Sequence, residues 1–188
     1  TLKHDKETLM KTLSVILRSL QLVDLLYEDI RGSGLSEAVC EVLLRYTGDE
    51  SIEECCIQIM ALLVANSEAT HEAFKRRDVV SIVVDNMRVY KTKTLQLACC
   101  KALAFLSKYM DVVDYLAIMN ISGMLLYCAT TFNEAENVLH FAQCVSNISV
   151  NEVCSLQLIQ DGAVETLLQF CEKYMEEEST LEAVTLSV

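Results

Sequence analysis

The chain has 188 residues, a hydrophobic content of 52 % and a formal net charge of −12, with no Pro and only five Gly. This length supports a real hydrophobic core, and the scarcity of helix breakers favours long helices. Its apolar runs are too short to span a membrane, and nine cysteines, an odd number, do not suit a secreted disulfide framework.

One long helical pattern occurs four times along the chain, in Leu9–Leu20, Ile52–Leu63, Leu95–Leu106 and Asn137–Ile148. Counted back from the last residue of each segment, apolar or thiol side chains stand at offsets 0, 3, 4 and 7, which form one stripe of an α-helix. The last residues of neighbouring segments are 43, 43 and 42 positions apart. One helix type is therefore predicted to recur with the same face buried.

Two further helices are predicted in each repeat. A second type of helix opens at Gly34, Asp78, Gly123 and Gly162, and a short helix precedes the last three of these positions, in Glu68–Lys75, Val112–Met119 and Val153–Ile159. A Gly opener permits a sharp reversal between two helices without a steric cost. The predicted unit is a short helix, a turn, a longer helix, a loop and a long helix.

Polar loops precede the long helices, and Asp49, Thr92 and Ser179 are predicted as their N-caps. Residues 180–188 have the pattern of the middle of an apolar helix, so we expect both ends to be cut from a longer protein. The N-terminal residues show no signal-peptide pattern. We expect a cytoplasmic protein, with the nucleus as the alternative.

No single unit can bury its apolar stripe alone, so neighbouring units must stack. The predicted fold class is all-α, a right-handed α-solenoid of about four three-helix repeats that is truncated at both ends. The chain is read as a single domain whose units cover residues 1–20 (partial), 21–66, 67–109, 110–150 and 151–188 (partial).

The repeats resemble those of the armadillo family. Residues 159–168, IQDGAVETLL, are similar to the family's second-helix opening xxGAIxxLL, and residues 141–148, FAQCVSNI, are similar to its third-helix pattern AxWALSNI. Weaker copies extend over the whole chain. HEAT repeats rank second, because they usually have two helices and a shorter period.

The resemblance implies that the third helices line a concave groove for a partner. The family's peptide-clamping Asn corresponds to Asn147 and its Trp to Gln143, whereas the other units have different residues there, which argues against a nuclear-import receptor. Phe105 is expected as an apolar anchor, Asn147 as a backbone clamp, and Lys101 and Lys108 as charge readers. The full set of expected groove residues is Gln58, Leu62, Lys101, Phe105, Lys108, Gln143 and Asn147.

Candidate chemical sites have simpler structural explanations. His140 and Cys144 are four residues apart on one helix face, but their columns in the other repeats hold packing residues. The cysteine pairs at 55–56 and 99–100 point about 100° apart and cannot chelate one metal ion together. No phosphate loop, zinc-protease or nucleophile-elbow motif is present. We predict no catalytic residue, no metal site and no cofactor.

Charge is unevenly distributed along the chain. Residues 75–108 carry eight basic and two acidic side chains, whereas the segments on both sides are strongly acidic. One interpretation is a solvated helix surface, and the other is a binding site for an acidic segment of a partner. The acidic flanks argue against nucleic acid. Beside Lys101 and Lys108, the predicted basic patch comprises Lys75, Arg76, Arg77, Arg88, Lys91 and Lys93.

These patterns favour a non-enzymatic scaffold or adaptor that binds an extended or helical segment of a partner protein along the third helices. The partner is a protein or peptide, with an acidic segment as one option. The alternative is a regulator that acts on a folded partner, such as a GTPase or a chaperone, through the convex face or the ends. An enzyme is a distant third. The oligomeric state is open.

Overall fold

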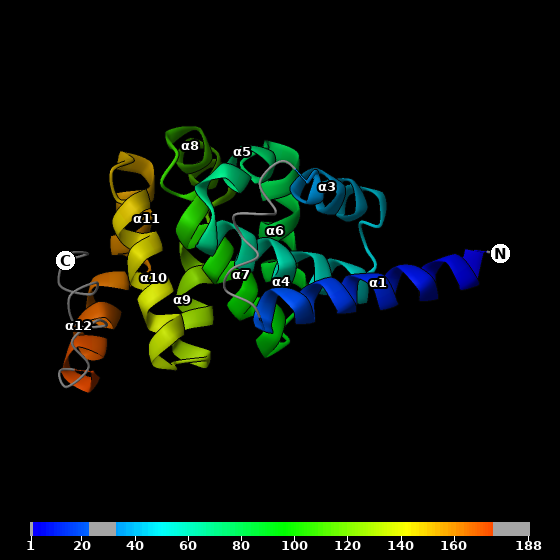
Figure 1. The fold of residues 1–188 in the computed structure, drawn as a ribbon. Helices are drawn as coiled ribbons and strands as arrows, with labels where there is room; N and C mark the ends of the chain where they lie inside the picture. The colour runs from blue at the N-terminus through cyan, green and yellow to red at the C-terminus, as the bar shows by residue number, and fades with distance from the viewer. Residues whose placement is uncertain (1, 23–32, 175–188) are drawn as a thin grey trace.

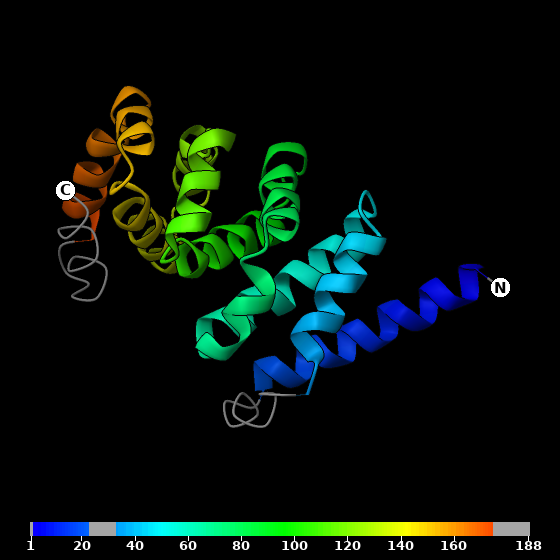
Figure 2. The same cartoon turned by 90° about the horizontal axis from the view of Figure 1, so that it is seen from above.

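The computed structural model describes residues 2–22 and 33–174, and this part of the chain contains helices and no strand. The all-α class is thus confirmed. Figures 1 and 2 show an elongated array in which α1 and α12 lie at opposite ends. Among these helices none is by itself long and apolar enough to cross a membrane, and α8 with α9 reaches that length only as a pair bent by 88°.

The long helices pack against one another in chain order. They are α1 (Leu2–Leu22), α4 (Glu50–Asn66), α7 (Lys93–Leu106) and α10 (Ala135–Ile148). Helix α4 packs on α1 and α7, and α7 packs on α10. The four predicted reference residues, Leu20, Leu63, Leu106 and Ile148, are all buried, with at most 3 % of their surface exposed. The periodic stripe therefore does face the core.

The remaining helices lie between consecutive long helices in the chain, except for α11 and α12, which follow α10. The short set is η1 (Glu68–Thr70) with α5 (His71–Phe74), α8 (Met110–Met119) and α11 (Glu152–Gln160). The second set is α3 (Leu35–Arg45), α6 (Arg77–Val89), α9 (Ser122–Thr131) and α12 (Ala163–Lys173). Of this set, α3 packs on α4, α6 on α7, and α9 on α10. Each long helix from α4 onward therefore has its own partner from the second set.

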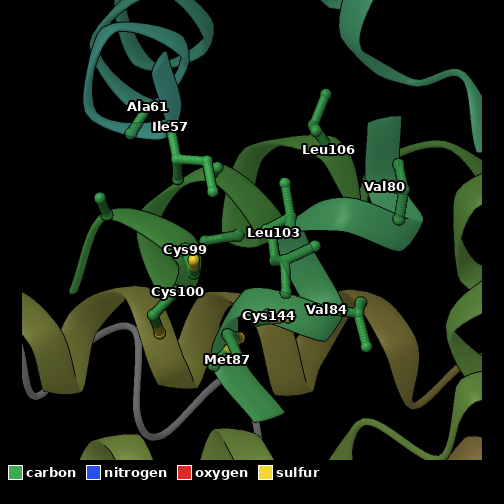
Figure 3. Close-up of a cluster of buried hydrophobic side chains, with 14 of the residues drawn as sticks. Ile57, Ala61, Val80, Val84, Met87, Cys99, Cys100, Leu103, Leu106 and Cys144 are labelled. Atoms are coloured by element: carbon green, nitrogen blue, oxygen red, sulfur yellow. The ribbon is translucent and has the colours of Figure 1, made fainter. Parts of the chain in front are cut away.

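The hydrophobic core is continuous along the array. Around α7, side chains from α4, α6, α7 and α10 gather in one buried cluster (Figure 3). Leu103 lies in the middle of this cluster and is fully buried, as are Val84 and Met87 of α6. Helix α7 is thus held by apolar contacts with its neighbours on several sides.

The predicted turn glycines do not all act alike. Gly34 and Gly162 are the N-caps of α3 and α12 and have left-handed backbone angles, with φ of 75° and 84°. Gly123, however, is the second residue of α9, so the prediction that it opens a turn is wrong. The left-handed residue before α9 is Asn120, with φ of 51°, a conformation that Asn tolerates better than most residues.

This difference predicts opposite effects of one substitution at two glycines. Gly162→Ala should lower the free energy of unfolding by about 1 kcal/mol or more, because a Cβ disfavours the left-handed region. Gly123→Ala should leave it unchanged or raise it by up to about 1 kcal/mol, because Ala favours a helix and the new Cβ would meet its nearest neighbour at an ordinary 3.7 Å. Urea unfolding of both variants measures this, and equal effects would contradict it.

The predicted N-caps are in position but do not cap through their side chains. Asp49 and Thr92 precede α4 and α7, and neither side chain accepts a backbone N–H there. Asp49 instead forms an ion pair with Lys6 of α1. A side-chain cap exists at α11, where Asn151 Oδ1 accepts from the N–H groups of Val153 and Cys154. Ser179 and residues 180–188 lie outside the described residues.

Buried polar side chains connect three long helices to the ends of the helices before them. The Glu53 carboxylate of α4 accepts from Gly48 N–H at 3.0 Å. Gln96 of α7 donates to the carbonyl oxygens of Met87 and Tyr90, and Asn137 of α10 donates to those of Cys128 and Phe132. All three side chains are at most 3 % exposed. Gln96 and Asn137 thereby satisfy carbonyl groups that the end of the preceding helix leaves unpaired, and Glu53 satisfies an N–H group of the loop before α4.

Candidate binding groove

A cavity of about 290 Å³ lies across the four long helices. Leu17 and Gln21 of α1 form part of its wall, and α7 provides more of the lining residues than any other helix. The other lining residues are Gln58, Ala61, Leu62, Lys93, Thr94, Leu97, Ala98, Lys101, Glu134, Glu136, Asn137 and His140. Residues more than 100 positions apart in the sequence therefore meet in one hollow.

The cavity combines an apolar floor with a charged wall. Leu17, Leu62 and Leu97 present aliphatic side chains, whereas Lys101 of α7 and Glu136 of α10 are charged. On α7, positions 93, 97 and 101 are four residues apart and share one face of the helix. The opposite face of α7 carries Leu95, Cys99 and Leu103, which are fully buried. The side chains at positions 93, 97 and 101 therefore reach the surface.

The predicted groove residues fall into two groups. Gln58, Leu62 and Lys101 line the cavity. Phe105, Lys108, Gln143 and Asn147 do not, although they lie on or next to the same two helices, α7 and α10. The Phe105 ring lies 6.0 Å from the His140 ring, centroid to centroid, and Lys108 Nζ lies 5.3 Å from the Phe105 centroid.

Asn147 is already used within the protein. Its Nδ2 donates to Ala104 O and to Ser107 Oγ, both at 3.1 Å, and so ties α10 to α7. An amide nitrogen has two hydrogens, and both are engaged here. The clamp role expected for Asn147 would require these bonds to be exchanged for bonds to a partner.

Two ion pairs connect α7 with the start of α10 beside the cavity. Lys93 pairs with Glu134, and Lys101 Nζ lies 3.1 Å from Glu136 Oε1. The hydrogen bonds from these lysines lower the pKa of each carboxyl group. The charges on the cavity wall are therefore balanced in the free protein.

His140 is the unusual polar residue of the cavity wall. Its side chain is buried, yet neither ring nitrogen has a hydrogen-bond partner. Burial lowers the pKa of the imidazole, the neighbouring Lys101 charge lowers it further, and Glu136 acts in the opposite direction. The repeat pattern predicts that position 140 is a packing position, and the burial of His140 confirms this. The pattern could not predict that the two ring nitrogens lack hydrogen-bond partners.

The predicted basic patch is divided between the two ends of α6, which lie about 18 Å apart at 1.5 Å per residue. Near its start, Lys75 pairs with Glu72 at 2.8 Å and Arg76 with Asp78 at 2.7 Å. At its end, Arg88 pairs with Asp85 at 3.2 Å. Arg77 and Lys91 lie instead over the rings of Tyr115 and Tyr127. Much of the local positive charge is thus neutralised within the protein.

The cysteines behave as core residues. Eight of the nine are buried, and Cys171 is half-buried. Burial raises the pKa of the Cys56 and Cys144 thiols to about 12, so both are protonated and unreactive near neutral pH. Among residues 2–22 and 33–174, no group of three His, Cys, Asp or Glu side chains is placed to hold a metal ion.

No protein-family model, curated protein or solved structure matches the chain. The residues and their geometry therefore carry the functional argument.

Proposed function

We propose that this chain forms a right-handed, armadillo-type α-solenoid that binds a segment of another protein along α1, α4, α7 and α10, without catalysing a reaction. The observation that carries this proposal is the cavity shared by these four helices, with its apolar floor and charged wall. Residues at equivalent repeat positions meet there, since Gln58 and Lys101 occupy one column and lie on neighbouring helices.

The repeated packing supports the solenoid interpretation. Equivalent apolar residues are buried in each long helix, and the polar connections of Glu53, Gln96 and Asn137 recur at nearly the same repeat position. Such recurrence is expected when each unit contacts mainly its neighbours. An open array of this kind leaves one face of every long helix available to a partner.

The cavity suits side chains of a protein better than a large cofactor. Pockets for small-molecule ligands have volumes of about 300–1,000 Å³, so about 290 Å³ lies at the lower limit of that range. Neighbouring helices pack about 8–10 Å apart, and an extended peptide rises about 3.3 Å per residue, so about a dozen residues would follow the four helices. The expected location stays the cytoplasm, with the nucleus as the alternative.

A matched pair of substitutions tests the binding face. Leu62→Glu places a charge in the cavity wall, and Ile118→Glu makes the same kind of change on α8, where Ile118 is 75 % exposed. Partners would first be identified by cross-linking mass spectrometry in cell extract, and their affinities then measured with purified proteins. We expect Leu62→Glu to weaken binding at least about tenfold, which equals about 1.4 kcal/mol, and Ile118→Glu to leave it unchanged.

One observation favours the alternative of a regulator that acts on a folded partner. Val153, Leu156 and Ile159 of α11 and Leu168 of α12 are each at least half exposed, so one end of the described array presents several apolar side chains. If that end were the binding surface, Leu156→Glu would abolish partner binding and Leu62→Glu would not. Cross-links concentrated on α11 and α12 would give the same answer.

A further inference from the structure

A carboxylate oxygen of the protein itself lies between two nitrogen atoms of the cavity wall. Glu136 Oε1 is 3.1 Å from Lys101 Nζ and 3.6 Å from His140 Nε2. The first is a charge-assisted hydrogen bond, and the second is too long to be one. This oxygen marks a position where two groups of the protein can hold a negative charge.

Glu136 does not fill this position firmly. Its side chain is 73 % exposed, and an ion pair of that exposure contributes little to stability because water and salt screen it. Lys101, by contrast, is only 24 % exposed and is fixed against the cavity wall. The lysine is therefore the preorganised partner, and the glutamate can rotate away at little cost.

His140 supplies a second, independent requirement for a ligand. Its ring nitrogens are buried without hydrogen bonds, an arrangement that costs free energy unless something pairs with them. The imidazole belongs to the cavity wall and its Nε2 faces Glu136 Oε1, so a group that displaces Glu136 can reach it. Binding of such a group would recover hydrogen bonds that the free protein lacks.

We propose that this part of the cavity is a subsite for a side-chain carboxylate of the partner, an Asp or Glu, which replaces Glu136 between Lys101 and His140. An apolar side chain of the same segment then lies on Leu62 and Leu97. The proposal rests on the function proposed above and specifies the partner's chemistry at one point of the groove.

Other groups fit this position less well. An ammonium or guanidinium group would have to compete with Lys101 and Lys93 for Glu136 and Glu134, the carboxylates of the same cavity. A neutral hydroxyl or amide could pair with His140 but would not compensate the Lys101 charge if it displaced Glu136. A carboxylate does both, because it accepts from the ammonium and from the imidazole N–H.

The subsite should bind a carboxylate more tightly at mildly acidic pH. The charged groups that face His140 are Glu136 on its own helix and Lys101 on α7, with Lys93 and Glu134 farther along the wall. A carboxylate within hydrogen-bond distance of the ring favours the imidazolium form more than Glu136 does at 3.6 Å. Because burial lowers the pKa of His140 in the free protein, the affinity should rise as pH falls below about 6.5. Below the carboxylate's own pKa, about 4.3 for a Glu side chain, the gain is lost.

Two small probes of nearly equal shape test the subsite in the whole chain. Phenylpropanoate carries a carboxylate on an apolar arm, and phenylpropanamide is its neutral counterpart. Their binding can be followed by calorimetry and by the NMR signals of the His140 ring. We expect the carboxylate to bind at least about tenfold more tightly than the amide and to shift the His140 signals. Equal binding of the two probes, or binding that leaves His140 unchanged, would overturn the proposal.

Variants with matched controls make the test specific. Glu136→Gln should strengthen phenylpropanoate binding several-fold because the competing carboxylate is gone, and a misfolded protein would not show such a gain. Glu152→Gln removes the same charge from the exposed first turn of α11 and should have no effect. Lys101→Met should abolish the preference for the carboxylate, whereas Lys11→Met, at an exposed position of α1 outside the cavity, should preserve it. If Glu136→Gln and Glu152→Gln behave alike, Glu136 does not occupy the subsite.

The outcomes separate this proposal from the function on which it rests. If partner peptides bind across α4 and α7 but the two probes bind equally, the carboxylate subsite is wrong and the groove stands. If phenylpropanoate binds at Lys101 and no cross-linked partner reaches the long helices, the subsite stands and the proposed function fails.

Discussion

Leu103→Ala is expected to lower the free energy of unfolding by about 2–5 kcal/mol, the usual cost of removing a fully buried leucine side chain. Leu103 has 0 % of its surface exposed and lies in the cluster formed by α4, α6, α7 and α10 (Figure 3). The substitution removes apolar contacts with helices on several sides of α7 and leaves a cavity that the neighbouring helices can close only in part. Equilibrium denaturation in guanidinium, followed by circular dichroism, measures the loss.

Leu62→Ala is the matched control for this prediction. Leu62 is also a leucine of a long helix, but its side chain is half-buried at the groove. Its replacement should cost clearly less than that of Leu103, because fewer contacts are lost and no enclosed cavity forms. If both variants lost the same stability, Leu103 would not occupy the central position in the core that the structure gives it.

Asn137→Asp is expected to lower the free energy of unfolding by about 3–5 kcal/mol at neutral pH. The Asn137 amide is 3 % exposed and donates to the carbonyl oxygens of Cys128 and Phe132 at the end of α9. An ionised carboxylate has the same shape but no donor, so it would bring a buried negative charge against two carbonyl oxygens. Denaturation at several pH values would measure this, and the loss should shrink in acid, where the carboxyl group regains a proton.

Gln143→Glu provides the control, since it makes the same amide-to-carboxylate change on the same helix. Gln143 is half-buried, so a charge there keeps more contact with water than one at Asn137, which is 3 % exposed. We expect its effect to stay within about 0.5 kcal/mol. A large loss in both variants would show that α10 resists added negative charge in general, and the role assigned to the Asn137 donors would then be wrong.

The sequence predicted the helices better than their ends. Apolar positions such as Leu63 and Leu106 recur at one period, and burial of a whole stripe leaves a strong pattern. Turns depend on single backbone angles, which several residue types can adopt. This explains why the reversal predicted at Gly162 is found there, at a left-handed residue, whereas the one expected at Gly123 has its left-handed residue at Asn120.

The candidate site was predictable only where it follows the repeat. Gln58 and Lys101 lie at equivalent columns of the long helices and do line the cavity. Glu136 acquires its importance from its ion pair with Lys101 on another helix, and His140 from the nearby charge of the same lysine. Such relations between helices have no signature in a single sequence. For the same reason the cations of the middle segment look like one patch in the sequence, although many of them are paired locally.

The cysteines are spread over most of the helices, so the reactivity of each thiol can report where the protein unfolds. Buried thiols occur in α3, α4, α7, α9, α10 and α11, and half-buried Cys171 lies in α12. A thiol inside a packed core is alkylated only when the surrounding structure opens. The order in which iodoacetamide labels these positions, followed peptide by peptide in mass spectra, would therefore show whether the chain unravels from its termini or loses all its helices in one cooperative event.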